Sequence, residues 1–367
     1  MRILAVDVGT GTQDVLLWDS EQALENCPQL VMPAPTMIVA AAIRAATAAR
    51  LPILLTGVTQ GGGPCAWAME DHLRAGLAVY ATPDAARTFD DELEKVAGLG
   101  VTLVSDDEAR ALRDVQRIAL RDLYLDRILA TLAAFGVPTA LDALAVAVFD
   151  HGNAPPGVSD RTFRFDYIAE TVNAPTGLAA FAFLRGAIPP RLTRMEAVAR
   201  TVDPDLPLLV MDTGPAAVLG ALDDPALRAP RSLLVANVGN FHTLAFHLVD
   251  GRVVGLLEHH TGELSPAELE TYLERLGAGT ITNQEVFDDQ GHGALVADPV
   301  APRPERLAVT GPRRGLLAES RLAPYLAVPH GDMMLAGCFG LLRAYAVHAP
   351  AAAPAVEASL GAAWQAH

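Results

Sequence analysis

An aspartate followed by a run of glycine and threonine lies near the start of the chain, in the segment Asp7-Val8-Gly9-Thr10-Gly11-Thr12-Gln13-Asp14. Apolar residues flank this segment on both sides, a pattern that predicts two strands joined by a tight turn. Glycines let backbone N–H groups approach phosphate oxygens, and a nearby carboxylate can hold magnesium or its waters. We expect a phosphate- and magnesium-binding hairpin, and an ordinary hairpin with a glycine-rich turn is the alternative. The expected ligands are Asp7, Gly9, Thr10, Gly11, Thr12 and Gln13.

Two further aspartates each follow an apolar strand and are candidates for a catalytic base. Asp212 opens Asp212-Thr213-Gly214, where a carboxylate at a strand end can accept a hydroxyl proton during in-line phosphate transfer. Asp150 opens Asp150-His151-Gly152, where the carboxylate could orient magnesium-bound water and His151 could shuttle a proton. Asp212 could instead only cap its helix, and Asp-His-Gly could be an ordinary strand-ending turn.

Other polar groups carry weaker signals. The loop at 56–64 follows a strand and precedes a helix, so its amides could collect an anion or form a flexible turn. Asp160-Arg161 and Arg313-Arg314 are the plausible fixed cations. The histidines do not indicate a zinc site, because the pairs 259/260 and 242/247 each point to opposite sides of a strand.

The elements around these residues repeat in plan. Strands alternate with helices up to residue 149, which favours a mostly parallel, covered sheet. A second series begins at 207, and both halves contain a strand, a glycine-rich turn and a second strand, at 3–19 and 232–249. We therefore expect an N-terminal lobe at 1–205, a C-terminal lobe at 206–345 and a weakly ordered tail at 346–367.

Composition excludes several classes of protein. The formal net charge of −16 argues against a nucleic-acid or anionic-membrane surface, so any phosphate must be held in a local pocket. Lys95 is the only lysine, and no Gly-Lys-Ser/Thr run of a P-loop exists. The three cysteines have no paired spacing, which excludes a CxxC zinc site and a CxxxCxxC cluster motif. Because no long apolar run or leader pattern occurs, we expect a soluble cytoplasmic protein.

The hairpin at 7–14 resembles the first phosphate motif of the actin-like ATPase and sugar-kinase superfamily. Segments 237–243, 310–314 and 336–340 then resemble its second phosphate loop, its adenosine loop and its last connecting helix. This resemblance implies an α/β fold of two ribonuclease H-like lobes with a nucleotide cleft between them, and ATP and Mg²⁺ as cofactors. It adds these expected nucleotide ligands: Asn237, Gly239, Asn240, Thr243, Gly311, Pro312 and Arg313. Asp7 and Asp150 are the expected metal ligands.

Two departures from the superfamily pattern bear on activity. Asn237 replaces the usual aspartate of the second loop, and the adenosine loop reads Gly-Pro-Arg-Arg instead of Gly-Gly. The first makes an actin-like hydrolytic arrangement doubtful, and the second leaves adenine specificity open. The segment that begins at Asp212 resembles the part of carbohydrate kinases that supplies the base, and those kinases tolerate a second loop without aspartate.

Segments 7–14, 150–152, 311–314 and 331–334 also resemble a prokaryotic family that carries a pyruvate formate-lyase activating enzyme label. That label implies radical chemistry, for which the cluster cysteines are missing. We expect a Mg-ATP-dependent phosphotransferase for a small polar metabolite, with Asp212 or Asp150 as base. The alternatives are an ATP-hydrolysing activator of a partner enzyme and, because of Asn237, a nucleotide-binding protein without turnover. Nothing in the sequence indicates an oligomeric state.

Overall fold

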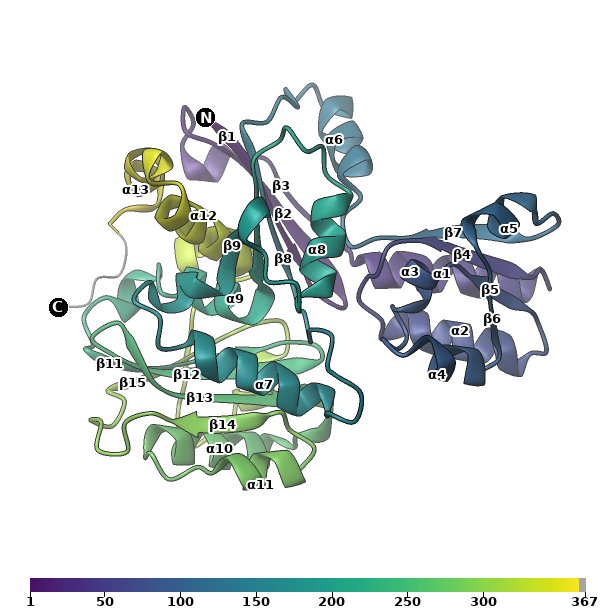
Figure 1. Ribbon diagram of the computed structural model, residues 1–367. Helices are drawn as coiled ribbons and strands as arrows, with labels where there is room; N and C mark the ends of the chain where they lie inside the picture. Colours follow the sequence, from purple (N-terminus) through teal and green to yellow (C-terminus); the bar gives the residue numbers. More distant parts are fainter. Residues whose placement is uncertain (363–367) are drawn as a thin grey trace.

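The structure is a computed structural model that describes residues 1–362. Its first sheet has six strands in the order β3-β2-β1-β8-β10-β9 (Figure 1). Strands β1, β2 and β3 form an antiparallel meander, β8 and β10 continue it in parallel with β1, and β9 pairs antiparallel with β10. These strands are β1 Arg2–Val8, β2 Thr12–Asp19, β3 Gln29–Pro33, β8 Ala143–Val148, β9 Ala182–Leu184 and β10 Leu208–Asp212. Strand β8 is an unbroken buried apolar run, as expected for a parallel strand covered on both faces.

The second sheet repeats this plan, in the order β14-β13-β12-β11-β15-β16. Again an antiparallel meander, β11 to β13, is continued by a parallel strand beside its first member. The strands are β11 Ser232–Val238, β12 His242–Val249, β13 Arg252–His260, β14 Gly293–Val296, β15 Arg306–Thr310 and β16 Tyr325–Leu326. The shared order 3-2-1-4-5 is that of a ribonuclease H-like sheet, so the structure confirms the expected pair of actin-like lobes.

A third sheet of four parallel strands, in the order β6-β5-β4-β7, was not expected. It is an insertion between β3 and α6 with its own hydrophobic core, and in Figure 1 it forms the separate body at the right. Its elements are α1 Pro35–Ala48, β4 Ile53–Gly57, α2 Pro64–Arg74, β5 Val79–Ala81, α3 Pro83–Ala86, α4 Leu93–Gly98, β6 Val101–Leu103, α5 Asp106–Ala111 and β7 Gln116–Leu120. The insertion pairs only with itself, so 1–205 is not one lobe.

The remaining helices pack on the two ribonuclease H-like sheets. They are α6 Leu125–Ala134, α7 Asp160–Thr171, α8 Thr193–Arg200, α9 Thr213–Ala221, α10 Pro266–Gly277, α11 Asn283–Asp288, α12 Ala336–His348 and α13 Ala353–Leu360. Short 3-10 turns are η1 Leu24–Asn26, η2 Gly177–Phe181, η3 Arg185–Ala187, η4 Pro225–Leu227, η5 Thr261–Glu263, η6 Arg314–Leu317, η7 Pro329–Gly331 and η8 Pro350–Ala352. Both α10 and α11 begin with a capping box.

The predicted lobe boundary near 205 is wrong. Strand β10 is hydrogen-bonded to β8 and β9 in the first sheet, and the second sheet starts only at β11. Helix α12 then returns to the first lobe and crosses α9, where Gly220 and Gly340 let the backbones touch: a Cβ on either glycine would overlap a carbonyl of the facing helix. The predicted weakly ordered tail is wrong over 346–360, which is largely helical, while 363–367 lie outside the described residues.

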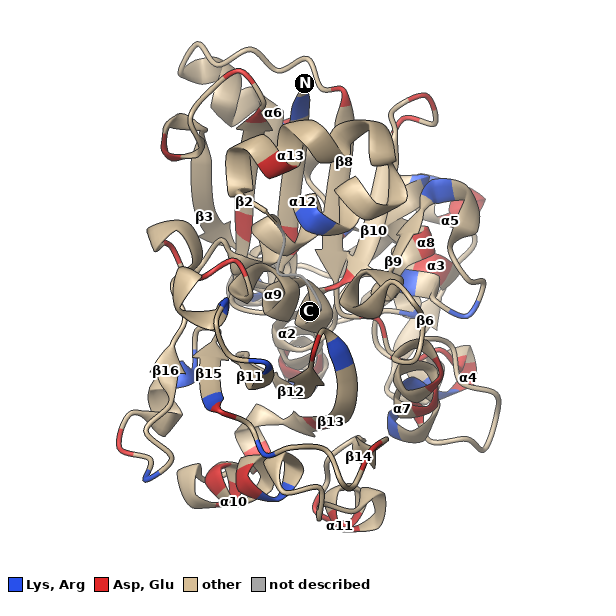
Figure 2. Ribbon diagram, turned by 90° about the vertical axis from the view of Figure 1, so that its left-hand side faces the viewer, with Lys and Arg blue, Asp and Glu red and all other residues tan. Residues whose placement is uncertain are grey.

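Charge is spread over the outside of the molecule. Figure 2 shows acidic residues gathered along outer helices such as α10, which carries three glutamates and one arginine. Among the described residues, no helix combines the length and the apolar character needed to cross a membrane.

Candidate functional site

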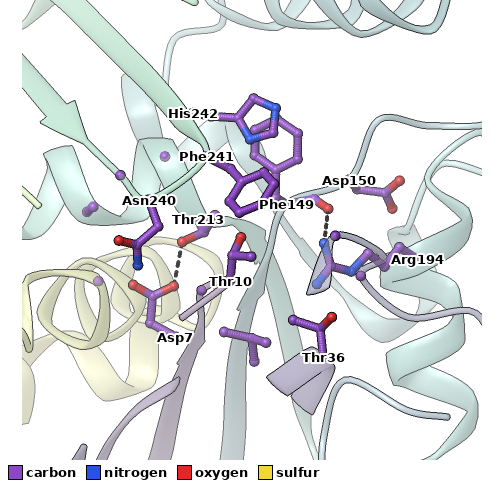
Figure 3. Close-up of a pocket in the computed structure, with 18 of the residues that line it drawn as sticks. Asp7, Thr10, Thr36, Phe149, Asp150, Arg194, Thr213, Asn240, Phe241 and His242 are labelled. Atoms are coloured by element: carbon purple, nitrogen blue, oxygen red, sulfur yellow. Dashed lines mark hydrogen bonds between the residues drawn. The ribbon is translucent and has the colours of Figure 1, made fainter. Parts of the chain in front are cut away.

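A cleft of about 310 Å³ lies where the two ribonuclease H-like sheets and the insertion meet. The walls include the first hairpin turn, the loop at 59–63, the Asp150-His151-Gly152 turn, the second hairpin turn and Thr310-Gly311-Pro312. Figure 3 shows Thr10 of the first turn, Asp150, and Asn240 and His242 of the second turn around one space. Its volume falls at the lower end of the range for small-molecule sites, which is about 300–1,000 Å³.

The two hairpin turns, 8–12 and 238–242, have the same backbone and face each other. In the first turn Gly9 N–H donates to the carbonyl of Thr12, and in the second Gly239 N–H donates to that of His242, each at 2.9 Å. The turns meet at Gly11, where an added Cβ would lie 2.7 Å from Asn240 Nδ2. The predicted juxtaposition of two loops is therefore present.

Most predicted loop residues reach the cleft, but three do not. Gly9, Thr10, Thr12, Asn237, Gly239 and Asn240 line it. Gly11 lies against Asn240, the Gln13 amide donates to the carbonyl of Pro33 at 2.9 Å, and the Thr243 hydroxyl pairs with that of Thr261 at 2.9 Å. Gln13 and Thr243 are thus used within the protein and do not line the cleft.

Two carboxylates stand opposite each other at the start of the first hairpin. Asp7 and Asp14 are cross-strand partners, and both line the cleft. Asp7 Oδ1 accepts a hydrogen bond of 2.5 Å from the Thr213 hydroxyl (Figure 3). Burial raises the pKa of Asp7 to about 6. Burial, reinforced by the Asp7 and Asp332 charges, raises the pKa of Asp14 to about 8.

Buried polar atoms without a protein partner mark where a ligand would be satisfied. Asp14 Oδ1 and Thr310 Oγ1 are both buried at the cleft without a hydrogen bond from the described residues. Carboxylate and hydroxyl oxygens are hard ligands of the kind that magnesium prefers. The residues present therefore fit a magnesium–nucleotide complex at this wall, with Asp14 as a candidate that the sequence analysis did not name.

Asp150 lies on the opposite side of the cleft and is held rigidly. Its two oxygens accept from Gly152 N–H at 2.8 Å and from Met195 N–H at 2.9 Å. Burial raises the pKa of this carboxyl, while the hydrogen bonds and two neighbouring arginines oppose the rise. One lone-pair site on each oxygen stays free, so Asp150 retains the capacity to accept a substrate proton.

Asp212 does not have the position of a base. Its side chain is fully buried, does not line the cleft, and accepts from Arg164 at 2.7 and 3.2 Å and from Gly214 N–H at 3.2 Å. Arg164 also donates to Glu258 at 2.8 Å, so it joins the end of β10 to β13. Among the alternatives that the sequence left open, the structure shows the helix cap, with a buried ion pair added.

The remaining expected cations, at 161, 313 and 314, do not line the cleft. Gly311 and Pro312 line the cleft, but the Arg313 side chain is exposed outside it, and Arg314 Nη1 donates to the carbonyl of Ala327 at 2.8 Å. Arg161 donates to two backbone carbonyls near β14.

Arg194, which the sequence did not single out, is one of two arginines among the described residues that line the cleft, the other being Arg87. It donates to the carbonyl of Phe149 (Figure 3). It also donates to Asp122 at 2.6 and 2.9 Å and lies against Gly61. No spacing pattern could have found it, because Asp122 is 72 residues away.

The three cysteines are free and buried, and within residues 1–362 they form no metal-binding group. The group of metal-ligating side chains that does occur there is His151, His242 and His292. Residues 151 and 242 line the cleft. Sequence spacing gave no sign of this arrangement, since the three residues come from three distant segments.

A family model described as "Putative pyruvate format-lyase activating enzyme (DUF1786)" matches residues 60–316, more than half of the chain. No curated protein matches. Among solved structures, the chain is similar to the ethanolamine utilization protein EutJ from Carboxydothermus hydrogenoformans, at 13% identity and a TM-score of 0.33 over 93% of this chain and 89% of that one. It is also similar to the ROK hexokinase from Thermus thermophilus, at 13% identity and a TM-score of 0.24 over 69% of this chain and 48% of that one.

A member of the Ppx/GppA protein family from Aquifex aeolicus shares 10% identity, with a TM-score of 0.31 over 90% of this chain and 72% of that one. At such low identity and TM-scores, the assignment of two ribonuclease H-like lobes rests on the strand order of the two sheets.

Proposed function

We propose that this chain, which belongs to the DUF1786 family, is a magnesium- and ATP-dependent phosphotransferase that acts on a small polar metabolite in its cleft. The observation that carries the proposal is the pair of facing glycine turns with two carboxylates at the base of one of them. In a ribonuclease H-like pair of lobes, this is the place where backbone amides can surround phosphates on two sides.

The first hairpin would hold the cation. Asp7 and Asp14 supply carboxylate oxygens on neighbouring strands, and Thr10 and Thr12 supply hydroxyls at the turn. Bound magnesium would neutralise phosphate charge, which is its usual contribution to phosphoryl transfer. The Thr213 hydroxyl keeps Asp7 Oδ1 oriented, so the carboxylate does not have to be ordered on binding.

Asp150 is the proposed base. It is the cleft carboxylate on the side away from Asp7 and Asp14, and two backbone N–H groups fix its plane. Burial destabilises its ionised form, which makes it a better proton acceptor than an exposed aspartate. Arg194, fixed by Asp122, places a permanent positive charge beside the same wall.

The family description names an activator of a radical enzyme, and the chain lacks the cysteine set for that chemistry. Cys27, Cys65 and Cys338 are separately buried, and burial raises the pKa of the Cys65 and Cys338 thiols. An activator that works through nucleotide hydrolysis and lobe closure is the other outcome of the experiment below.

The experiment has a binding arm and a turnover arm. Mg-ATP or Mg-ADP should raise the melting temperature of purified protein, because a ligand that binds only the native state stabilises it. Asp7→Asn should remove most of that shift, and Asp126→Asn, at an exposed surface ion pair, should leave it unchanged. Absence of any shift at millimolar nucleotide would refute nucleotide binding.

Turnover would be sought by screening a metabolite library for ATP-dependent phosphorylation. Asp150→Asn should keep the nucleotide-induced shift and lower turnover by about 10²-fold or more, the range for loss of a general base. ATP hydrolysis that needs no acceptor and rises with a partner protein would identify an activator. Full turnover in Asp150→Asn would refute the assigned base.

A further inference from the structure

Four histidines from four separate segments gather at the inner wall of the cleft. This histidine cluster consists of His151, His242, His260 and His292. His242 on β12 and His260 on β13 are cross-strand partners, with ring centres 5.0 Å apart. His292 lies 4.7 Å from the ring of His260 and 5.5 Å from that of His151, which follows β8. The cluster therefore joins the first lobe to the second.

The spacing of three of these side chains suits one metal ion. Ligand nitrogens of His151, His242 and His292 all lie within 4.8 Å of one another. A zinc ion bound at about 2.0–2.1 Å would require these nitrogens to move somewhat closer together. Imidazole is the nitrogen ligand that zinc and its divalent transition-metal neighbours prefer.

The contacts of His260 and His292 leave one nitrogen of His292 without a hydrogen-bond partner among the described residues. His260 Nδ1 contacts the carbonyl of Gln290 at 2.8 Å, its Nε2 faces His292 Nε2 at 3.1 Å, and His292 Nδ1 faces Glu258 Oε2 at 3.4 Å. Arg164 donates to both oxygens of Glu258, and His292 Nδ1 makes no hydrogen bond with the described residues. This nitrogen is therefore free to bind a metal ion.

One nitrogen of His242 is likewise unused within the described part of the protein. His242 stacks on Phe149 with ring centres 3.8 Å apart (Figure 3), and its Nε2 is buried without a hydrogen bond from the described residues. An imidazole with an unused nitrogen at a cleft is available as a metal ligand.

We propose that His151, His242 and His292 bind a divalent transition-metal ion of the zinc class, with a free coordination position facing the cleft. The open side follows from the lining, since His151 and His242 border the cleft and His292 lies behind them. Three histidines with an open position are the arrangement of catalytic rather than structural zinc. His260 acts as a positioning residue, because its Nε2 lies 3.1 Å from His292 Nε2 and leaves His292 Nδ1 for the metal. This site is separate from the magnesium position proposed at Asp7 and Asp14.

The test uses full-length, tag-free protein that has been stripped with a chelator and contains no nucleotide. Titration with Zn²⁺, and with Co²⁺ as a spectroscopic probe, should give one tight equivalent and cobalt absorption bands of a histidine-ligated ion. Excess Mg²⁺ should not compete, since it prefers oxygen ligands. Because nucleotide is absent, the result is independent of the phosphotransferase proposal.

Substitutions distinguish the proposed metal ligands from the histidines that only lie near them. His151→Ala and His242→Ala should each weaken zinc binding by more than about 100-fold, and His260→Ala by about 10- to 100-fold, the range for a positioning residue. His348→Ala is the matched control: this half-buried histidine contacts the carbonyl of Ala179 outside the cluster and should leave binding unchanged. His151→Gln is a second variant for the case in which the alanine variants fail to fold, because residue 151 lies in a turn rather than in a strand. Less than one-tenth of an equivalent in wild type, or wild-type affinity in well-folded His151→Gln, would overturn the proposal.

Discussion

The two hairpins share a backbone and differ in chemistry. Their glycine turns have the same hydrogen bond, yet the first carries Asp7 opposite Asp14 where the second carries Asn237 opposite Leu244. Thr12 at the end of the first turn likewise corresponds to His242 in the second. The repeated strand order therefore gives the two hairpins the same backbone shape. Their side chains differ, so the first hairpin supplies hard oxygen donors and the second supplies amide and imidazole nitrogens.

Burial acts in opposite directions on the two sides. It raises the pKa of Asp7 and Asp14 and lowers that of His242, because a dry environment disfavours the charged form of either group. Both sides are thus biased toward neutrality. Permanent charge comes from Arg164 and Arg194, each held by buried carboxylates.

The largest expected effect on the free energy of unfolding comes from breaking the connection between the lobes. Arg164→Leu leaves Asp212 on the first sheet and Glu258 on the second buried without their shared cation. Loss of one member of a buried ion pair costs about 3–5 kcal/mol, so the free energy of unfolding should fall by that amount in denaturant titrations. Arg313→Leu, at an exposed position, is the control and should change it by less than about 0.5 kcal/mol. A loss below about 1 kcal/mol for Arg164→Leu would show that the lobes do not depend on this link.

The second prediction concerns pH and the carboxylate side. The pKa of Asp14 is about 8 in the folded chain and 3.8 ordinarily, so the folded state holds a proton that the unfolded state has released. Its contribution to stability is complete below about pH 4 and is lost as pH rises through about 8. Asp14→Asn should remove this alkaline decline, on the order of 3 kcal/mol between pH 5 and pH 8.

The measurement is the free energy of unfolding against pH, without magnesium or nucleotide. Asn237→Ala, at the position that matches Asp7 in the second hairpin, should keep the wild-type slope. Parallel curves for wild type and Asp14→Asn would mean that Asp14 titrates normally and that the two hairpins do not differ in this respect.

The smallest expected effect concerns the turn tips. Phe241 stacks on Trp67 of the insertion with ring centres 5.5 Å apart, whereas the matching residue of the first turn is Gly11, which cannot stack. A double-mutant cycle of Trp67→Ala and Phe241→Ala should give a coupling of about 0.5–1.5 kcal/mol in unfolding experiments. Coupling near zero would show that the insertion rests on the second hairpin without stabilising it.

Local patterns were enough to predict the first hairpin. Asp7 to Asp14 form a strand, turn and strand whose contacts span only a few residues, so glycines and apolar alternation specify them directly. The same holds for the second hairpin, for the helix cap at Asp212 and for the turn at Asp150. The sequence by itself thus determined the two-lobed plan, because that plan repeats a local unit twice.

Only the tertiary structure decided which polar residues meet. Arg164 reaches Asp212 and Glu258 across 48 and 94 residues, which removes Asp212 from the role of base. The insertion separates from the first lobe because its strands pair with one another, a choice that apolar runs do not encode. Adjacent histidines do point to opposite sides of a strand, but strand register places His242 beside His260, and the 151 and 292 loops bring their imidazoles to the same wall. Such contacts depend on the pairing of distant strands, which periodicity within one strand cannot reveal.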